Sequence, residues 1–126
     1  MIILIPPSEG KNDGGNHASL SELPVVTQAL LREAETKDKT KLYKSRTQEA
    51  IKLNDSLLDA PTMPAIKRYS GVVYDAIDYA SMRNTDFFDE HVRIISGLFG
   101  LLQPQDMIPN YKFPIRLLTA ARKWHD

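Results

Sequence analysis

Apolar residues follow two different patterns along this chain. Residues 1–5 are a continuous aliphatic run, which predicts a buried strand, central in its sheet and parallel to its neighbours. Pro6 and Pro7 end this run. Beyond it, apolar residues recur at helical spacing in two long stretches, one following Pro24 and one following Thr47. Their apolar positions are Val25, Val26, Ala29, Leu30 and Ala34, and then Ala50, Ile51, Leu53, Leu57 and Leu58.

A third stretch at helical spacing lies nearer the C-terminus. Phe88, Val92, Ile95, Phe99 and Leu102 are separated by four, three, four and three residues, which predicts the buried face of a helix starting near Thr85. Gly97 and Gly100 interrupt it, so the helix either continues to Leu102 or breaks between residues 96 and 100. Pro104 ends the apolar run in both cases. Shorter helices are predicted over residues 65–69 and 115–124.

These elements predict an α+β fold that is mostly helical, with the N-terminal strand in a small sheet. The chain has 126 residues, which is enough for one domain with a modest core. We therefore expect a single domain over residues 1–126. Its 42% hydrophobic and 25% charged residues are typical of a globular protein in water.

The charges balance overall but are unevenly distributed. There are 16 basic and 16 acidic residues, so the composition gives no sign of a protein built wholly around nucleic acid. Residues 91–126 nevertheless carry a local excess of three positive charges. Residues 37–46 hold five basic residues and one acid, a run that could follow phosphates but is more often a solvated face.

Several kinds of chemistry find no support in the sequence. Cysteine is absent, which removes disulfides and thiolate catalysis and fits a reducing cytoplasm. Residues 1–5 are too short for a signal peptide or a membrane span, so a cytoplasmic protein without membrane contact is expected. His17, His91 and His125 lie far apart without metal-site spacing, and no cofactor is predicted. No nucleophile motif appears, so catalysis is unsupported.

The polar loop of residues 8–15 is the first candidate site. It follows a predicted strand and contains Gly10, Lys11 and two further glycines, as phosphate-binding loops often do, but it lacks the Walker spacing. A solvated turn is the simpler interpretation. The alternative is an enzyme or nucleotide-binding protein in which Lys11 holds a phosphate and Ser8, Glu9, Gly10 and Tyr74 line the pocket.

Three blocks of sequence resemble the YaaA family. They are residues 5–11 (IPPSEGK), residues 69–74 (YSGVVY) and residues 91–106 (HVRIISGLFGLLQPQD), followed by Pro109 and Tyr111-Lys112. The family comprises bacterial peroxide stress proteins that are also grouped under the uncharacterised family name UPF0246. The resemblance implies a cytoplasmic protein of oxidative-stress defence that binds DNA through a helix-hairpin-helix element and a basic cleft. It also implies that the protein limits intracellular iron and DNA damage.

The resemblance also suggests which residues would bind DNA. It puts the hairpin at Gly97, Leu98, Phe99 and Gly100, whose amides would contact the sugar–phosphate backbone without reading sequence. Candidate phosphate partners are Lys11, Arg93, Lys112 and Arg116.

This chain departs from the family pattern in three respects. Gln103 stands where the family commonly has arginine, and Pro104 leaves little room for a second helix. The resemblance covers only the N-terminal half of the family, so the chain resembles half of a larger fold. A half-domain that needs a partner chain, or a homodimer that replaces the other half, is therefore a further alternative.

Overall fold

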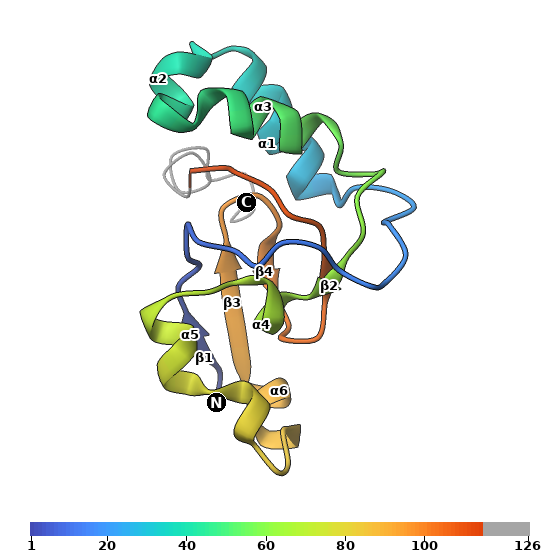
Figure 1. Ribbon diagram of the computed structural model, residues 1–126, viewed down its shortest axis with the longest axis vertical. Coiled ribbons are helices and arrows are strands. Elements are labelled where there is room, and N and C mark those ends of the chain that lie inside the picture. The colour runs from blue at the N-terminus through green and yellow to red at the C-terminus, as the bar shows by residue number, and fades with distance from the viewer. Residues whose placement is uncertain (115–126) are drawn as a thin grey trace.

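The computed structural model describes residues 1–114 and shows an α+β fold with two small sheets and several short helices (Figure 1). This confirms the predicted fold class, whereas the helix predicted over residues 115–124 lies outside the described part. No helix among the described residues is long and apolar enough to cross a membrane. In chain order the elements are β1 (Ile3–Ile5), α1 (Val25–Glu35), α2 (Lys39–Tyr43), the 3-10 helix η1 (Lys44–Arg46), α3 (Thr47–Asp55), β2 (Met63–Pro64), α4 (Ala65–Arg68), α5 (Val72–Ile77), the 3-10 helix η2 (Tyr79–Ser81), α6 (Asp86–His91), β3 (Val92–Ser96), β4 (Gly100–Leu102) and β5 (Met107–Ile108).

The larger sheet has the strand order β1-β3-β4, with β1 parallel to β3. The parallel pairing confirms the prediction, but the central, buried position was wrong. Strand β1 forms one edge of this sheet, and Ile3 and Leu4 are 39% and 55% exposed. An aliphatic run shows that a segment favours the extended conformation, but it cannot show whether a neighbour covers both sides.

The helix predicted to start near Thr85 is confirmed as α6, but its predicted continuation beyond His91, whether to Leu102 or to a break between residues 96 and 100, was wrong. Helix α6 ends at His91, and the chain continues as the antiparallel hairpin of β3 and β4. Val92, Ile94 and Ser96 are buried while the residues between them are half-buried, which is the period-two pattern of a strand. Residues 97–99 form the turn, and Gly100, the first residue of β4, has a φ of +73°, which suits glycine. A helix-hairpin-helix element, implied by the resemblance, is therefore wrong for this segment, because both arms of its turn are strands.

Helices α1, α2 and α3 form a separate group beside the tip of the β3–β4 hairpin (Figure 1). The predicted helices after Pro24 and Thr47 are confirmed as α1 and α3. Leu30 of α1 is fully buried, and Thr27 Oγ1 donates a hydrogen bond to Leu98 O at 2.9 Å. The helical group is therefore fixed to the hairpin by apolar packing and by a buried hydrogen bond.

Arg68 joins three loops at the centre of the molecule. Its side chain is fully buried, and its guanidinium donates to Asn12 O at 2.7 Å, to Ile108 O at 3.1 Å and to Pro61 O at 3.3 Å. The three acceptors belong to the loop after β1, the segment before β2, and β5. This buried cation fixes the loop after β1 against β5 and the segment before β2.

Candidate anion-binding site

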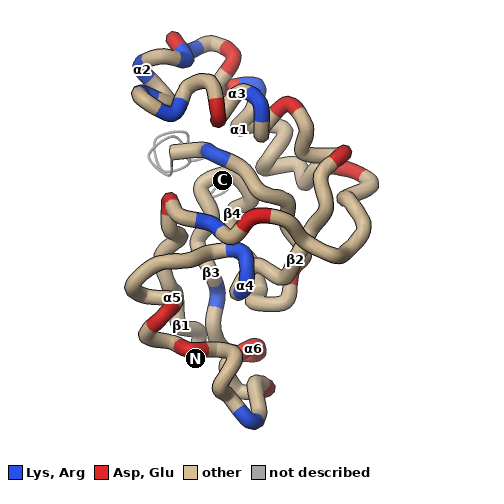
Figure 2. Tube along the Cα trace, viewed as in Figure 1, with Lys and Arg blue, Asp and Glu red and all other residues tan. Residues whose placement is uncertain are grey.

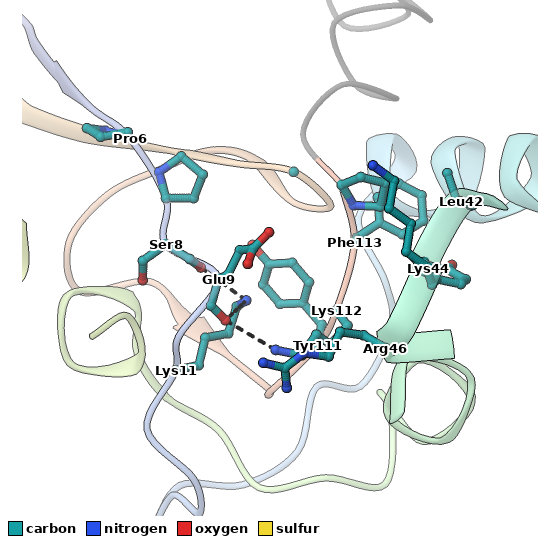
Figure 3. Close-up of a pocket in the computed structure, with 14 residues that line it drawn as sticks. Pro6, Ser8, Glu9, Lys11, Leu42, Lys44, Arg46, Tyr111, Lys112 and Phe113 are labelled. Carbon is teal, nitrogen blue, oxygen red and sulfur yellow. Dashed lines mark hydrogen bonds between the residues drawn. The ribbon is translucent and has the colours of Figure 1, made fainter. Parts of the chain in front are cut away.

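A pocket of about 430 Å³ lies where three segments distant in sequence meet (Figure 3). Its walls come from the loop after β1, from the end of α2 with η1, and from the segment after β5, and Gly97 of the hairpin completes them. The lining includes four basic side chains and one acid: Lys11, Lys44, Arg46 and Lys112, with Glu9. Figure 2 shows basic positions along α2 as well as on segments elsewhere in the chain. The arrangement concentrates positive charge in one concave space.

Lys11 is held at the pocket by its backbone and by its amine. The residue forms an antiparallel bridge with Tyr69, which anchors the loop against α4. Its Nζ donates to Ser8 O at 3.3 Å and to Glu9 O at 3.4 Å. The same nitrogen lies 4.4 Å from the centre of the Tyr111 ring, a cation–π contact. The loop therefore turns its lysine back into the pocket instead of out into water.

The surroundings of Lys11 weaken its hold on the proton. Burial lowers the pKa of Lys11 to about 8, and the positive charges of Lys112 and Arg68 add to this effect. The carboxylates of Glu9 and Glu49 act in the opposite direction without compensating for it. Lys11 therefore exchanges between cation and neutral amine near neutral pH, where an ordinary lysine remains charged.

Lys112 is positioned by an amide clamp from α3. Asn54 Nδ2 donates to Lys112 O at 2.7 Å, and Lys112 N donates to Asn54 Oδ1 at 3.2 Å. The Lys112 ammonium then donates to Glu9 O at 3.3 Å and lies 4.0 Å from Glu49 Oε1. Both lysine amines therefore share the carbonyl oxygen of Glu9 as an acceptor (Figure 3).

Lys44 and Arg46 form the opposite wall. Lys44 adopts a φ of +54°, which is uncommon for a residue with a side chain, where α2 turns into η1. Arg46 Nη1 lies 3.2 Å from Glu49 Oε2, and both side chains are about half exposed. An exposed ion pair of this kind contributes little to stability, so an incoming anion can compete with Glu49 for the guanidinium.

Beneath the pocket, three hydroxyl groups form a buried hydrogen-bonded floor. Tyr111 OH lies 2.8 Å from Ser96 Oγ and also hydrogen-bonds Tyr69 OH. Burial raises the pKa of Tyr111 to about 12 and raises that of Tyr69 further. Both phenols are therefore neutral at physiological pH. They support Lys11 through their rings and do not neutralise its charge.

Some of the predicted site residues meet at this pocket. The pocket lining includes five of them: Ser8, Glu9, Lys11, Gly97 and Lys112. Gly10 lies beside it, and its carbonyl accepts from Ser8 Oγ at 2.7 Å.

Other predicted residues do not meet there. Arg93 lies on β3, where its Nη1 donates to Asp89 O and Val92 O, and it is not part of the pocket wall. Tyr74 is buried and donates to Pro6 O at 2.6 Å, so it supports the pocket from behind. Arg116 lies outside the described residues.

The hairpin turn that was expected to contact DNA is buried. Leu98 is fully buried and Phe99 is 4% exposed, with both glycines buried beside them. The amides of Leu98 and Phe99 donate to Ser96 Oγ at 3.2 and 2.9 Å. Two of the turn's amides therefore already have hydrogen-bond acceptors inside the protein. The neighbouring pocket is the candidate anion site.

Sequence reasoning did not include Lys44 and Arg46 among the site residues. The basic run of residues 37–46 contained the signal, but its favoured interpretation was a solvated face. That interpretation suits Lys37 and Lys39, which pair with Glu33 and Glu35 on neighbouring helical turns. Glu49 and Asn54, which orient the pocket's cations, gave no signal because their roles depend on tertiary contacts.

Among residues 1–114, no group of three or more histidine, aspartate or glutamate side chains is arranged to hold a metal ion. The basic side chains that line the pocket give it cationic and amine chemistry.

Known proteins are similar to this chain over almost its whole length. The family model described as peroxide stress protein YaaA matches residues 1–123. A UPF0246 protein of Corynebacterium glutamicum is 35% identical over 124 residues, covering 89% of this chain and 50% of the relative. A UPF0246 protein of Streptomyces coelicolor is 33% identical over 131 residues, with the same two coverages. An uncharacterised protein of Campylobacter jejuni is 28% identical over 130 residues. The chain spans about half the length of these relatives.

Proposed function

The chain belongs to the peroxide stress protein YaaA family, and on this premise we propose that it binds the sugar–phosphate backbone of DNA through the basic pocket. In this role it contributes to the peroxide stress response by limiting DNA damage and intracellular iron. The binding surface is the pocket with Lys11 and Lys112 on one side and Arg46 on the other. The buried hairpin acts as its support.

The observation that carries this proposal is the convergence of four cations on one pocket. Lys11, Lys112 and the Lys44–Arg46 turn come from three separate segments, and they meet although the chain as a whole is neutral. Positive charge gathered in this way attracts phosphate oxygens.

The partners of these cations indicate how firmly each is held. Both lysine amines donate to backbone carbonyls, which are neutral acceptors, and Lys112 also lies 4.0 Å from Glu49. Arg46 makes an exposed ion pair with the same carboxylate. A phosphate therefore offers each of them a stronger, charge-assisted hydrogen bond. Such contacts position DNA without reading its bases, so binding is independent of sequence.

A salt titration of DNA binding tests this proposal. We expect mixed-sequence duplex DNA to bind at about 50 mM salt. For four phosphate contacts, a plot of the logarithm of the dissociation constant against the logarithm of salt concentration should have a slope of about 3.6. Arg46→Gln should reduce that slope by about 1. Lys52→Gln, on the exposed face of α3 and outside the pocket, is the matched control and should leave the slope unchanged. Fluorescence anisotropy with labelled duplexes of unrelated sequence measures both, and absence of binding at low salt would refute the proposal.

The affinity for DNA should also decrease as pH rises. The pKa of Lys11 is lowered to about 8, so its positive charge is present below that pH and is lost above it. Between pH 7 and pH 9 the loss of one phosphate contact should weaken binding about tenfold at 50 mM salt. Lys11→Arg remains charged throughout this range and should give a nearly flat profile. An equal decrease in both proteins would show that another group causes it.

A single nucleotide is a second candidate ligand. The observation that favours it is the pocket volume of about 430 Å³, because small-molecule sites occupy roughly 300–1,000 Å³. In this case free nucleotides should displace DNA from the protein at concentrations well below the concentration of inorganic salt that is needed for the same displacement. The same anisotropy assay separates the two ligands.

A further inference from the structure

Lys11 and Lys112 form a pair of amines at the wall of the pocket. Both nitrogens donate to Glu9 O, at 3.4 and 3.3 Å, so they lie close together around one carbonyl oxygen. Lys112 also lies near the carboxylate of Glu49 at 4.0 Å. Within residues 1–114, no carboxylate oxygen lies within 4 Å of Lys11 Nζ, whose partners are carbonyls and aromatic rings.

The two lysines therefore differ in chemistry. Lys112 is the member with an acidic partner, the carboxylate of Glu49 at 4.0 Å. Lys11 sits over the Tyr111 ring and beside another cation, and these are the surroundings that convert lysine into a nucleophile. The lowered pKa of Lys11, about 8, agrees with this geometry.

We propose that Lys11 forms an imine with a phosphorylated aldehyde, while Lys112 and Arg46 bind the phosphate group of the same ligand. This inference rests on the proposed function, because the pocket that binds phosphate is the pocket that holds the amine. The aldehyde can belong to an abasic sugar in DNA or to a small sugar phosphate. The two sources share one chemistry, which is a carbonyl carbon a few bonds from a phosphate.

The reaction needs no oxidant and no reductant. The lone pair of neutral Lys11 Nζ attacks the carbonyl carbon, and the carbonyl oxygen takes up a proton to give a carbinolamine. Loss of the nitrogen's remaining proton and of the hydroxyl group as water then forms the C=N bond. Addition of water reverses both steps, so the protein is recovered unchanged. Cyanoborohydride, added as an external reductant, converts the imine into a stable secondary amine.

Three basic side chains of the pocket remain after Lys11 has reacted, and two of them, Lys112 and Arg46, are placed to bind the phosphate. Lys112 and Arg46 both contact Glu49, at 4.0 and 3.2 Å, so a ligand phosphate can replace this carboxylate between them. Lys11 lines the same pocket as these two cations, and the volume of the pocket accommodates a sugar phosphate. A phosphorylated aldehyde can therefore react with the amine of Lys11 while its phosphate binds the two cations. An aldehyde without phosphate can react with the amine but has no group for the two cations to bind.

Reductive trapping on the 126-residue chain tests the inference. The protein is incubated with cyanoborohydride at pH 7.5 and either glyceraldehyde 3-phosphate or a duplex containing one abasic site, and modified lysines are identified by peptide mass spectrometry. We expect Lys11 to be labelled at least about tenfold more than exposed Lys52, because its neutral fraction is far larger. Unphosphorylated glyceraldehyde should label Lys11 much less than the phosphorylated form.

Substitutions locate the reactive amine and separate this inference from DNA binding. Lys11→Arg keeps the charge but removes the nucleophile and should abolish the selective adduct, whereas Lys52→Arg should not. Thermal unfolding verifies that each variant is folded, and peptide mapping of the unaltered chain identifies the labelled lysine independently of any variant. An adduct with either aldehyde supports the inference and shows which source is used.

Labelling spread evenly over the lysines, or no Lys11 adduct with either aldehyde, would overturn the inference. Anisotropy with intact duplex DNA is measured on the same samples. Binding of intact DNA without an adduct refutes the imine alone. An adduct with glyceraldehyde 3-phosphate and no DNA binding refutes the proposed function alone.

Discussion

Replacing Arg68 by leucine is expected to lower the free energy of unfolding by about 3 kcal/mol. The fully buried guanidinium donates to three backbone carbonyls, those of Asn12, Pro61 and Ile108. Leucine matches part of the volume but leaves these acceptors without a donor, and each buried acceptor without a partner costs about 1–3 kcal/mol. Part of that loss is offset because a buried charge no longer has to be desolvated. The net effect is still a large fraction of the stability of a small domain.

Urea unfolding followed by circular dichroism measures this effect. Arg68→Lys retains the charge but not the planar fork of donors, so it should recover only part of the lost stability. Arg83→Leu removes an exposed arginine and serves as the matched control, with an expected change within about 0.5 kcal/mol. If Arg68→Leu and the control change the free energy of unfolding by similar amounts, water hydrogen-bonds the three carbonyls in the variant, and the arginine is not needed to hold the loops together.

The helices that could be predicted from sequence are those with a single buried face. In α1, Leu30 and Ala34 of the predicted apolar face are buried, so the face that packs was identified correctly. Val25, which the spacing put on the same face, is 80% exposed at the start of the helix. In α3, Ala50 of the predicted face is likewise buried. These stretches have the helical period and lie beside residues that start helices, so local and tertiary preferences agree.

The β3–β4 hairpin could not be predicted because two periods fit the same residues. Phe88, Val92 and Ile95 are spaced as on a helix, yet Val92, Ile94 and Ser96 also alternate as on a strand. Pairing with β1 decides between them, and Ile94 lies opposite Ile5 in that register. The partner strand is about 90 residues away in the sequence, so no local window contains the deciding contact.

The candidate site was only partly predictable for a similar reason. The family resemblance pointed to Lys11 and Lys112, and the structure places both on one pocket. It gave no indication that Arg93 would lie elsewhere on β3, or that Arg46 would face Lys112 across Glu49. A basic residue is visible in any sequence, but the direction of its side chain depends on the packing of its whole segment.

Replacing Lys11 and Lys112 together by alanine is expected to weaken DNA binding by about 100-fold at 50 mM salt. Each phosphate contact contributes about tenfold to affinity at this salt concentration, because each releases a condensed counterion. Among residues 1–114, the partners of the two amines are neutral carbonyls, aromatic rings and one carboxylate 4.0 Å from Lys112, so both amines are available to phosphate. The salt dependence should fall by about 2 in logarithmic slope, and the difference from the unaltered chain should shrink as salt rises.

Lys52 and Lys67 provide the matched double replacement, since both are exposed lysines outside the pocket wall. Alanine at these two positions removes the same net charge and should change the affinity by less than about threefold. Equal weakening by the two double variants would mean that overall charge, and not the pocket, attracts DNA. Anisotropy at several salt concentrations distinguishes these results, because a general charge effect is screened while lost contacts change the slope. Circular dichroism spectra of both variants verify that the fold is retained, so that the difference in affinity reports on the pocket itself.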